Sequence, residues 1–183
     1  MHLFKTLLLL SALSACAAPS GNGNAALPSE PEVVNETIAV SHKGLSGVGG
    51  DALRYGTPRD AVIAVLQPHF DPPLSITTNE ECGAGPIVFV NYDLVSLNFQ
   101  QGVFVGWWFR TESALRTDRG IGLGSRWSEV QAVYPQVEEQ RDSTLGREFY
   151  ILDDGQHISG LLDGDGDDAL VTDLWGGTNC IFR

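Results

Sequence analysis

The chain has 183 residues, and its 23 Asp and Glu outnumber its 11 Lys and Arg, which gives a formal net charge of −12 at pH 7. This balance excludes nucleic acid as a partner, because phosphate binding needs clustered basic side chains. It also argues against adhesion to anionic lipid head groups. Any membrane contact should therefore be made through an attached lipid.

The amino terminus predicts a secretion signal. A weakly basic start, residues 1–5, precedes an apolar core over 6–15 that is too short to cross a bilayer. The core ends in Leu-Ser-Ala-Cys at 13–16, which resembles the lipobox of bacterial lipoproteins. The resemblance implies that residues 1–15 are removed and that Cys16 is acylated. Since Ala17 rather than Asp follows, it also implies the periplasmic face of the outer membrane; the alternative is an ordinary cleavage site beside an incidental thiol.

Residues 16–39 are expected to form a lipid-anchored, flexible tether. The segment is rich in Pro, Gly, Asn, Ser and Glu and has few large apolar side chains. Such a composition buries too little apolar surface to offset the entropy of ordering the chain.

A short stretch then occurs twice, over residues 53–66 and 121–134. Each copy runs from an apolar lead-in through Gly and then Thr or Ser into a helical pattern that a proline stops. Repetition of this kind predicts a repeated supersecondary unit. We therefore expect an α+β fold with two tandem repeats, 40–112 and 113–183, that share one folding unit. Each repeat should pack a helix, or a helical hairpin, on antiparallel strands.

The first repeat should begin with a helix capped by Thr57, with Pro58 at its first position and its end at Gln67. Its apolar stripe consists of Ala61, Val62, Val65 and Leu66. Strands should follow, because apolar residues alternate with period two and thereby predict one packed face. The alternating residues are Ile87, Phe89, Val95, Leu97, Phe99, Val103, Val105, Trp107 and Phe109. Residues 100–102 have the composition of a hairpin turn.

The second repeat should begin with a helix capped by Ser125, in which Glu129 lies at the positive end of the helix dipole. Its apolar stripe consists of Trp127, Val130, Val133 and Tyr134. Strands are expected over residues 148–152, 157–162, 169–175 and 180–183. The connections at 153–155 and 163–168 have turn chemistry.

These elements resemble the beta-lactamase inhibitor protein fold and the small outer-membrane lipoproteins of the barrel-assembly machinery. The resemblance is carried by residues 55–62 and 123–130, where Gly and then Thr or Ser precede a helix that contains Val. It implies helices packed on antiparallel strands. The inhibitors place a disulfide within each repeat, whereas here Cys82 and Cys180 lie in different halves, so inhibitory activity is not carried over.

Cys82 and Cys180 remain as a pair once Cys16 is assigned to lipid. In an oxidising compartment a disulfide is the default, and a loop of this length would stabilise the chain by about 4 to 5 kcal/mol. Two buried free thiols are the alternative.

The acidic sequence at 163–168 is the one candidate metal site. Asp163, Asp165 and Asp167 could converge on calcium, but Asp168 stands where an EF-hand needs Gly and Leu174 where it needs Glu. We expect a hairpin turn and no bound metal or other cofactor.

Other catalytic and nucleotide signatures are incomplete. The glycines at 120–124 lack the third Gly of a dinucleotide fingerprint and no Walker lysine follows, so no nucleotide is expected. Asp153, Asp154 and His157 could form an acid and base cluster, but turns are built from the same residues. His42 and His69 lie far away in sequence, and we expect that the protein is not an enzyme.

The aromatic sequence at 104–109 is the candidate protein-binding site. If Trp107 and Phe109 are packed, then Phe104, Gly106 and Trp108 occupy the opposite face of the same strand, and Gly106 would leave a shallow slot between two rings. The alternative is that another part of the chain covers them. We therefore expect a binding or structural module that recognises another envelope protein. An inhibitor of a secreted or periplasmic enzyme, and a hydrolytic or metal-dependent enzyme using the acidic loops, are the competing functions.

The lipid anchor can be tested directly. Cys16→Ser should release the mature protein from membranes or block its processing, because it removes the thiol that carries the lipid. Fractionation and intact mass spectrometry measure both effects. A mature chain without any acyl mass increment would contradict the anchor.

Overall fold

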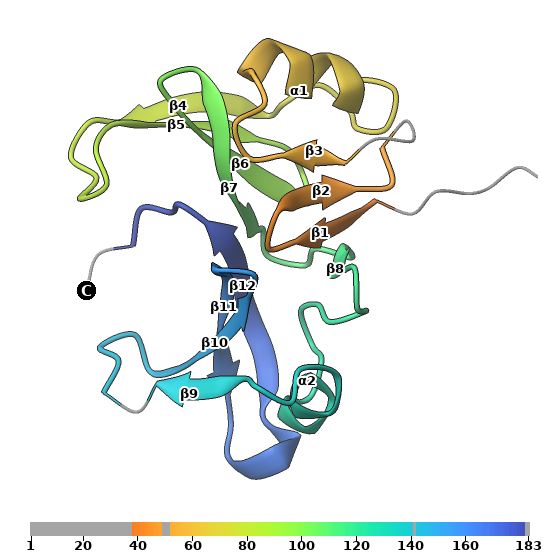
Figure 1. The fold of residues 1–183 in the computed structure, drawn as a ribbon, viewed down its shortest axis with the longest axis vertical. Helices are drawn as coiled ribbons and strands as arrows, with labels where there is room; N and C mark the ends of the chain where they lie inside the picture. Colours follow the sequence, from red (N-terminus) through yellow and green to blue (C-terminus); the bar gives the residue numbers. More distant parts are fainter. Residues whose placement is uncertain (1–37, 49–51, 141, 182–183) are drawn as a thin grey trace, which may run out of the picture. The chain divides into compact units, whose positions relative to one another are not determined.

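The computed structural model describes residues 38–48, 52–140 and 142–181 (Figure 1). The predicted signal 1–15, Cys16 and nearly all of the tether 16–39 lie outside the described residues. Neither helix of the described part has the length and the apolar run that a membrane crossing requires.

The predicted α+β class, with two tandem repeats of a helix on antiparallel strands, is wrong. The fold is mostly β-sheet, with 44% strand, 13% helix and only two helices in the described part. An eight-stranded antiparallel sheet has the order β4-β5-β6-β7-β12-β11-β10-β9, and a second sheet has the order β3-β2-β1-β8. The helical patterns dominated the prediction, while the strands of two or three residues have no detectable period.

The elements have the following bounds. The large sheet consists of β4 (Ser75–Asn79), β5 (Ile87–Asn91), β6 (Val95–Gln100), β7 (Val103–Phe109), β9 (Glu138–Gln140), β10 (Arg147–Asp153), β11 (Gln156–Asp163) and β12 (Leu170–Gly177). The small sheet consists of β1 (Ala39–Ser41), β2 (Gly44–Ser46), β3 (Leu53–Arg54) and β8 (Arg116–Thr117). The helices are α1 (Arg59–Leu66), α2 (Trp127–Val133) and the 3₁₀ helix η1 (Gly166–Asp168).

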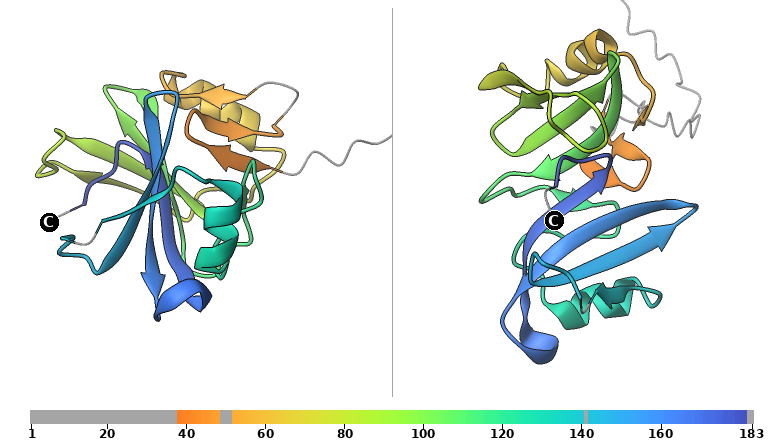
Figure 2. Two further views of the ribbon diagram at one scale, coloured as in Figure 1. Left: turned by 60° about the horizontal axis from the view of Figure 1, so that its bottom comes forward. Right: turned by 90° about the vertical axis from the view of Figure 1, so that its left-hand side faces the viewer.

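Both α-helices and the small sheet lie on one face of the large sheet, which we call the inner face (Figures 1 and 2). Their buried apolar side chains form one core with that face, and residues on both sides of the predicted boundary at 112 contribute to it. The opposite side of the large sheet is called the outer face.

The repeated stretch makes the same pair of backbone hydrogen bonds in both copies. The Gly56 N–H donates to the Phe104 carbonyl at 2.7 Å, and the Phe104 N–H donates to the Thr57 carbonyl at 2.9 Å. Residues 124–125 make both bonds with Val171 of β12, at 2.8 and 2.9 Å. The repeat therefore encodes the attachment of each helix start to a strand of the large sheet.

The predicted helix caps are wrong, because both side chains turn back toward the preceding turn. The Thr57 hydroxyl donates to the Arg54 carbonyl at 2.7 Å, and the Ser125 hydroxyl accepts a bond from the turn before it. In α2 the Glu129 carboxylate accepts the Arg126 N–H at 2.8 Å, so Glu129 does lie in the first turn.

The predicted stripe of α1 is half correct. Val62 and Leu66 are fully buried, whereas Ala61 is exposed and Val65 is 37% exposed, because the short helix contacts the core through one narrow face. In α2 the predicted stripe lies on the core, with Val133 at its margin.

Two predicted hairpin turns are confirmed. Gln101 and Gly102 have φ of 50° and 80°, and Asp154 and Gly155 have φ of 52° and 75°. Positive φ at both central residues is the geometry of the two-residue turns that match strand twist. The predicted strand at 180–183 is not observed at residues 180 and 181, and the other two residues lie outside the described part.

In β7 the odd-numbered alternation is correct for Trp107 and Phe109 and wrong for the residues before them, because a β-bulge interrupts the strand. Asn98 pairs with Gly106 and Phe99 pairs with Phe104, so Val105 is an extra residue in β7. An extra residue moves the side chains that precede it in the strand to the opposite face of the sheet. Phe104 is therefore fully buried in the inner core. In β5 the phase is also reversed, since Phe89 pairs with Asn98 on the outer face.

The two halves of the large sheet meet through only three residue pairs of β7 and β12. These pairs are Trp108 with Trp175, Trp107 with Gly176, and Gly106 with Gly177. A Cβ atom on Gly176 would approach the buried Trp107 ring to 2.7 Å, which is closer than real Cβ contacts. Glycine is thus required where the tryptophan crosses the neighbouring strand.

Gly176→Ala should lower the free energy of unfolding by about 1 to 3 kcal/mol, because the fully buried Trp107 ring cannot move away from the new methyl group. Chemical denaturation measures this loss. Gly83→Ala is the matched control, since no atom lies within 4 Å of its Cβ position. Equal stability of the two variants would contradict this account of the junction.

Candidate functional site

One row of side chains crosses the whole outer face. The register of the eight strands places these residues side by side, and all eight are polar or aromatic. From β4 to β9 the row consists of Ser75, Asn91, Ser96, Trp108, Trp175, Ser159, Tyr150 and Glu138. The outer face is therefore not a second apolar core.

Trp108 and Trp175 stack at the centre of this row, with ring centroids 5.0 Å apart and planes inclined by 22°. Trp175 is 2% exposed, but Trp108 is only half-buried. Of the three predicted binding residues, Trp108 is thus the one that solvent reaches on the outer face.

The predicted slot at Gly106 does not exist. The backbone of Thr178 occupies the space beside Gly106, and its carbonyl oxygen would clash with a Cβ atom there. Phe104 is absent from this face because of the bulge. The predicted site of Phe104, Gly106 and Trp108 is therefore corrected to Trp108 and its neighbours on the outer face.

The C-terminal segment, residues 178–181, lies across the outer face. The Thr178 N–H donates to the Val105 carbonyl at 2.8 Å. The Asn98 side-chain amide donates to the Thr178 carbonyl at 3.0 Å and to Asn179 Oδ1 at 2.6 Å. Asn179 lines a hollow on each side, so the segment separates two hollows.

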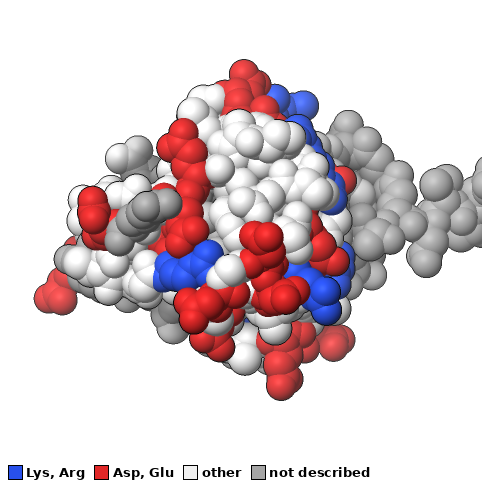
Figure 3. Space-filling view, turned by 90° about the horizontal axis from the view of Figure 1, so that it is seen from below, with Lys and Arg blue, Asp and Glu red and all other residues white. Residues whose placement is uncertain are grey.

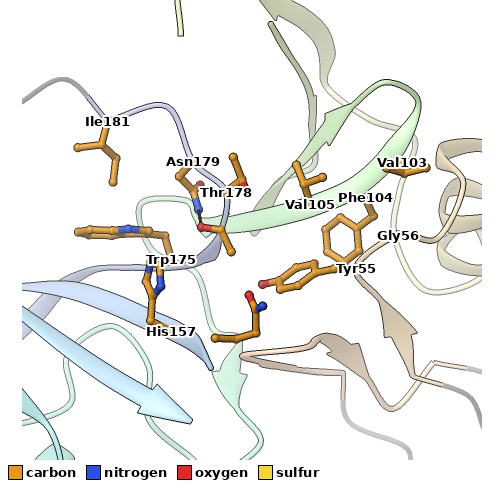
Figure 4. A pocket seen from close by; sticks show the side chains of 12 residues that line it. Tyr55, Gly56, Val103, Phe104, Val105, His157, Trp175, Thr178, Asn179 and Ile181 are labelled. Atoms are coloured by element: carbon orange, nitrogen blue, oxygen red, sulfur yellow. Dashed lines mark hydrogen bonds between the residues drawn. The ribbon is translucent and has the colours of Figure 1, made fainter. Parts of the chain in front are cut away.

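The first hollow has a volume of about 550 Å³ (Figure 4). It lies between β7 and β11, at the C-terminal end of β12. Tyr55, Phe104, His157 and Trp175 are its aromatic residues, and Phe104, fully buried, lines it from the inner core. The Tyr55 hydroxyl points into it and is buried without a hydrogen-bond partner, because the nearby Trp107 Nε1 donates to the Ser41 carbonyl at 3.0 Å. Burial raises the pKa of Tyr55 far above its ordinary value, and the proximity of Trp107 offsets this only in part.

The second hollow has a volume of about 390 Å³ and lies beside Trp108. Phe89 and Trp108 contribute rings, and Arg110 and Asp173 contribute opposite charges. Asn98 also lines it; this residue is fully buried and its Oδ1 has no hydrogen-bond partner. The hollow therefore combines aromatic surface with donors and acceptors, as binding sites commonly do.

Cys82 and Cys180 are free thiols in this structure, and they lie next to one another. Burial, together with the Cys82 thiol, raises the pKa of Cys180 to about 11. The Asn79 side-chain amide also donates to Cys180 Sγ at 3.4 Å. The predicted disulfide stays a prediction, and it would fix the C-terminal segment over the outer face.

If the disulfide forms in the cell, Cys82 and Cys180 should resist alkylation by iodoacetamide in denaturant until a reductant is added. Reduction should also lower the melting temperature, because it frees a long loop in the unfolded chain. Mass spectrometry and thermal unfolding measure the two effects. Alkylation of both residues in denaturant without reductant would show that no bridge exists.

The acidic residues of the candidate metal site lie on an exposed turn. Asp163, Asp165 and Asp167 are exposed around η1, and the described residues contain no group of three His, Cys, Asp or Glu that could hold a metal ion. Figure 3, which views the molecule from below in Figure 1, shows acidic groups spread around an uncharged surface. A solvated turn accounts for these residues.

Asp153 and Asp154 make contacts other than the suggested cluster with His157. Asp153 Oδ2 lies 3.5 Å from His42 Nδ1 and 3.1 Å from an Arg119 nitrogen. Asp154 lies 2.7 Å from Lys43 Nζ, whose hydrogen bond and charge lower the pKa of Asp154. The pairs with His42 and Lys43 connect the β10–β11 hairpin to the β1–β2 hairpin, and the pair with Arg119 connects it to the segment after β8.

Sequence reasoning missed three residues of the outer face and its hollows. Tyr55 lies in the repeated stretch at 53–66, but nothing in that pattern marks its side chain as part of a site. Asn98 and Glu148 occupy polar positions within apolar strands, and that pattern was a usable signal. Glu148 is fully buried and accepts bonds from the Ser143 and Tyr150 hydroxyls at 2.6 and 2.7 Å.

Comparison with known proteins leaves the function to be inferred from this geometry. No protein-family profile, no curated protein and no solved structure matches the chain. The resemblance carried by residues 55–62 and 123–130 therefore has no independent support.

Proposed function

We propose that this chain is a lipid-anchored binding module of the bacterial cell envelope that recognises another protein through its outer face. The observation that carries the proposal is the half-buried Trp108, which is stacked on Trp175 between two hollows. A fixed ring beside a hollow is the kind of anchor that dominates the energetics of protein interfaces.

The charge and the polar row support a protein ligand over the competing functions. A net charge of −12 disfavours polyanions, and the described acidic residues are dispersed or engaged in ion pairs that hold hairpins together. Within the polar row, Ser75, Asn91, Trp108, Tyr150 and Glu138 are at least partly exposed, and such amide, hydroxyl and aromatic groups offer the mixed contacts that protein interfaces use. The lipid at Cys16 would hold this face close to other envelope proteins.

The partner contact can be tested in living cells by placing the photo-reactive residue p-benzoylphenylalanine at His157. This exposed residue lines the first hollow. Irradiation should give one discrete protein adduct, which gel electrophoresis and mass spectrometry identify. The same residue placed at the exposed Ala64 of α1 is the control. Adducts from Ala64 but not from His157 would overturn the proposal.

Trp108→Ala should reduce the His157 adduct strongly, because truncation of an interface aromatic typically costs 1 kcal/mol or more, about a fivefold loss of affinity. Its cost in stability should be about 1 to 3 kcal/mol, because it loses the ring stack and the burial of about half a side chain. Trp107→Ala should instead cost about 3 to 5 kcal/mol, since Trp107 is fully buried. Equal destabilisation by both variants would show that Trp108 is core.

A further inference from the structure

The two edges of the large sheet are built differently. The β9 edge is three residues long, Glu138–Gln140, and it carries two carboxylates. The β4 edge is five residues long, with the uncharged sequence Ser-Ile-Thr-Thr-Asn. Short strands and charges are the devices by which proteins prevent pairing at a sheet edge. The β9 edge has both devices, and β4 has neither.

Nothing in the described part of the chain pairs with the free side of β4. The strand is bonded only to β5, through the register of Ser75 with Asn91 to Asn79 with Ile87. Four of its five residues are exposed. In an antiparallel pair, alternate residues direct their N–H and C=O groups away from the partner strand. These groups of β4 are consequently open to an extended backbone.

Two large apolar side chains accompany this open edge. Ile76 is 58% exposed, and Leu74, directly before the strand, is 64% exposed. Ile76 pairs with Val90 of the core, so it lies at the margin of the inner face. Leu74 is two residues earlier, so the alternation of a strand places it on the same side. Ser75 and Thr77 lie on the opposite side. An added strand would cover apolar groups on one side and polar groups on the other.

The acidic residues on either side of β4 favour a basic partner segment over a second copy of this chain. Asp71 precedes the strand and Glu80 and Glu81 follow it, and all three are exposed. A second copy of this chain would bring two such acidic rims together, in addition to two net charges of −12. A foreign segment with Lys or Arg at its ends would meet complementary charge instead.

We infer that β4 is a docking edge for an extended segment of another protein, which adds a ninth strand to the large sheet. The segment alternates apolar and polar residues and has basic residues at its ends. Main-chain hydrogen bonds to β4 fix it, while Leu74 and Ile76 select its apolar residues. This inference goes beyond the proposed function, since it assigns a second surface of the chain with its own docking mode and partner class.

A phage-displayed library of random twelve-residue peptides, selected on the purified full-length protein, tests the edge. Enriched sequences should share the alternating pattern with basic ends. Synthetic copies are then titrated against variants by fluorescence anisotropy. Ile76→Lys should weaken binding by about tenfold or more, because an edge lysine opposes strand addition. Leu170→Lys is the matched control, since Leu170 is 45% exposed on β12, a strand paired on both sides; it should change binding by less than about twofold.

Backbone methylation of the peptide separates strand addition from side-chain binding. N-methylation of the residues that face β4 should abolish binding, whereas methylation of the residues between them should not, because only the first set donates to the edge. Equal effects of both sets would overturn the inference, and so would a selection without enrichment.

The outcomes also distinguish this inference from the proposed function. Peptides that lose binding with Trp108→Ala but not with Ile76→Lys dock on the outer face, and they would refute the β4 edge while supporting the proposed function. Peptides that lose binding with Ile76→Lys but not with Trp108→Ala would support docking at the β4 edge, and they would show that Trp108 is not part of that contact. The His157 adduct in cells remains an independent readout of the outer face.

Discussion

The close approach of β7 and β12 is the constraint on which the large sheet depends. The two halves share only three residue pairs, and two of these pairs involve glycines of β12. A side chain at Gly176 would strike the Trp107 ring, and one at Gly177 would strike the Val105 carbonyl and the Tyr55 ring. Trp107 also donates from its indole to the Ser41 carbonyl, which attaches the small sheet to the junction. One tryptophan thus connects both halves of the large sheet with the layer that covers them.

The same junction shapes the outer face. After Gly177 the chain leaves β12 and crosses β7, so the pairing of β12 with β7 ends there. The first hollow lies beyond this point, between β7 and β11. The crossing segment is held by Asn98 and rests on Gly106, which has no side chain to obstruct it. The stacked Trp108 and Trp175 are then left beside the segment. The outer face and its hollows are therefore consequences of how the two half-sheets are joined.

The sequence predicted local structure well and global structure poorly, for physical reasons. The helices, the hairpins at 100–102 and 153–155 and most strands of the large sheet have strong local signals. The small sheet has strands too short to show a period, and the fold class was wrong as a result. The bulge at Val105 was equally invisible, because both faces of β7 carry apolar residues and alternation cannot reveal the slip. That one residue moved Phe104 from the predicted site into the core, while Trp108 stayed where the pattern placed it.

Several buried polar atoms in the described part have no hydrogen-bond partner within the protein. Leaving such an atom unpaired costs about 1 to 3 kcal/mol. In the described part the affected atoms include the Tyr55 hydroxyl, Asn98 Oδ1 and Ser159 Oγ. Tyr55 lines the first hollow, Asn98 lines the second, and Ser159 lies in the row beside Trp175. The Asn98 amide also holds the C-terminal segment, so this residue has a structural role as well, whereas the Tyr55 and Ser159 hydroxyls have no hydrogen-bond partner in the described part. Their concentration on and beside the outer face is what donors and acceptors supplied by a bound protein would explain.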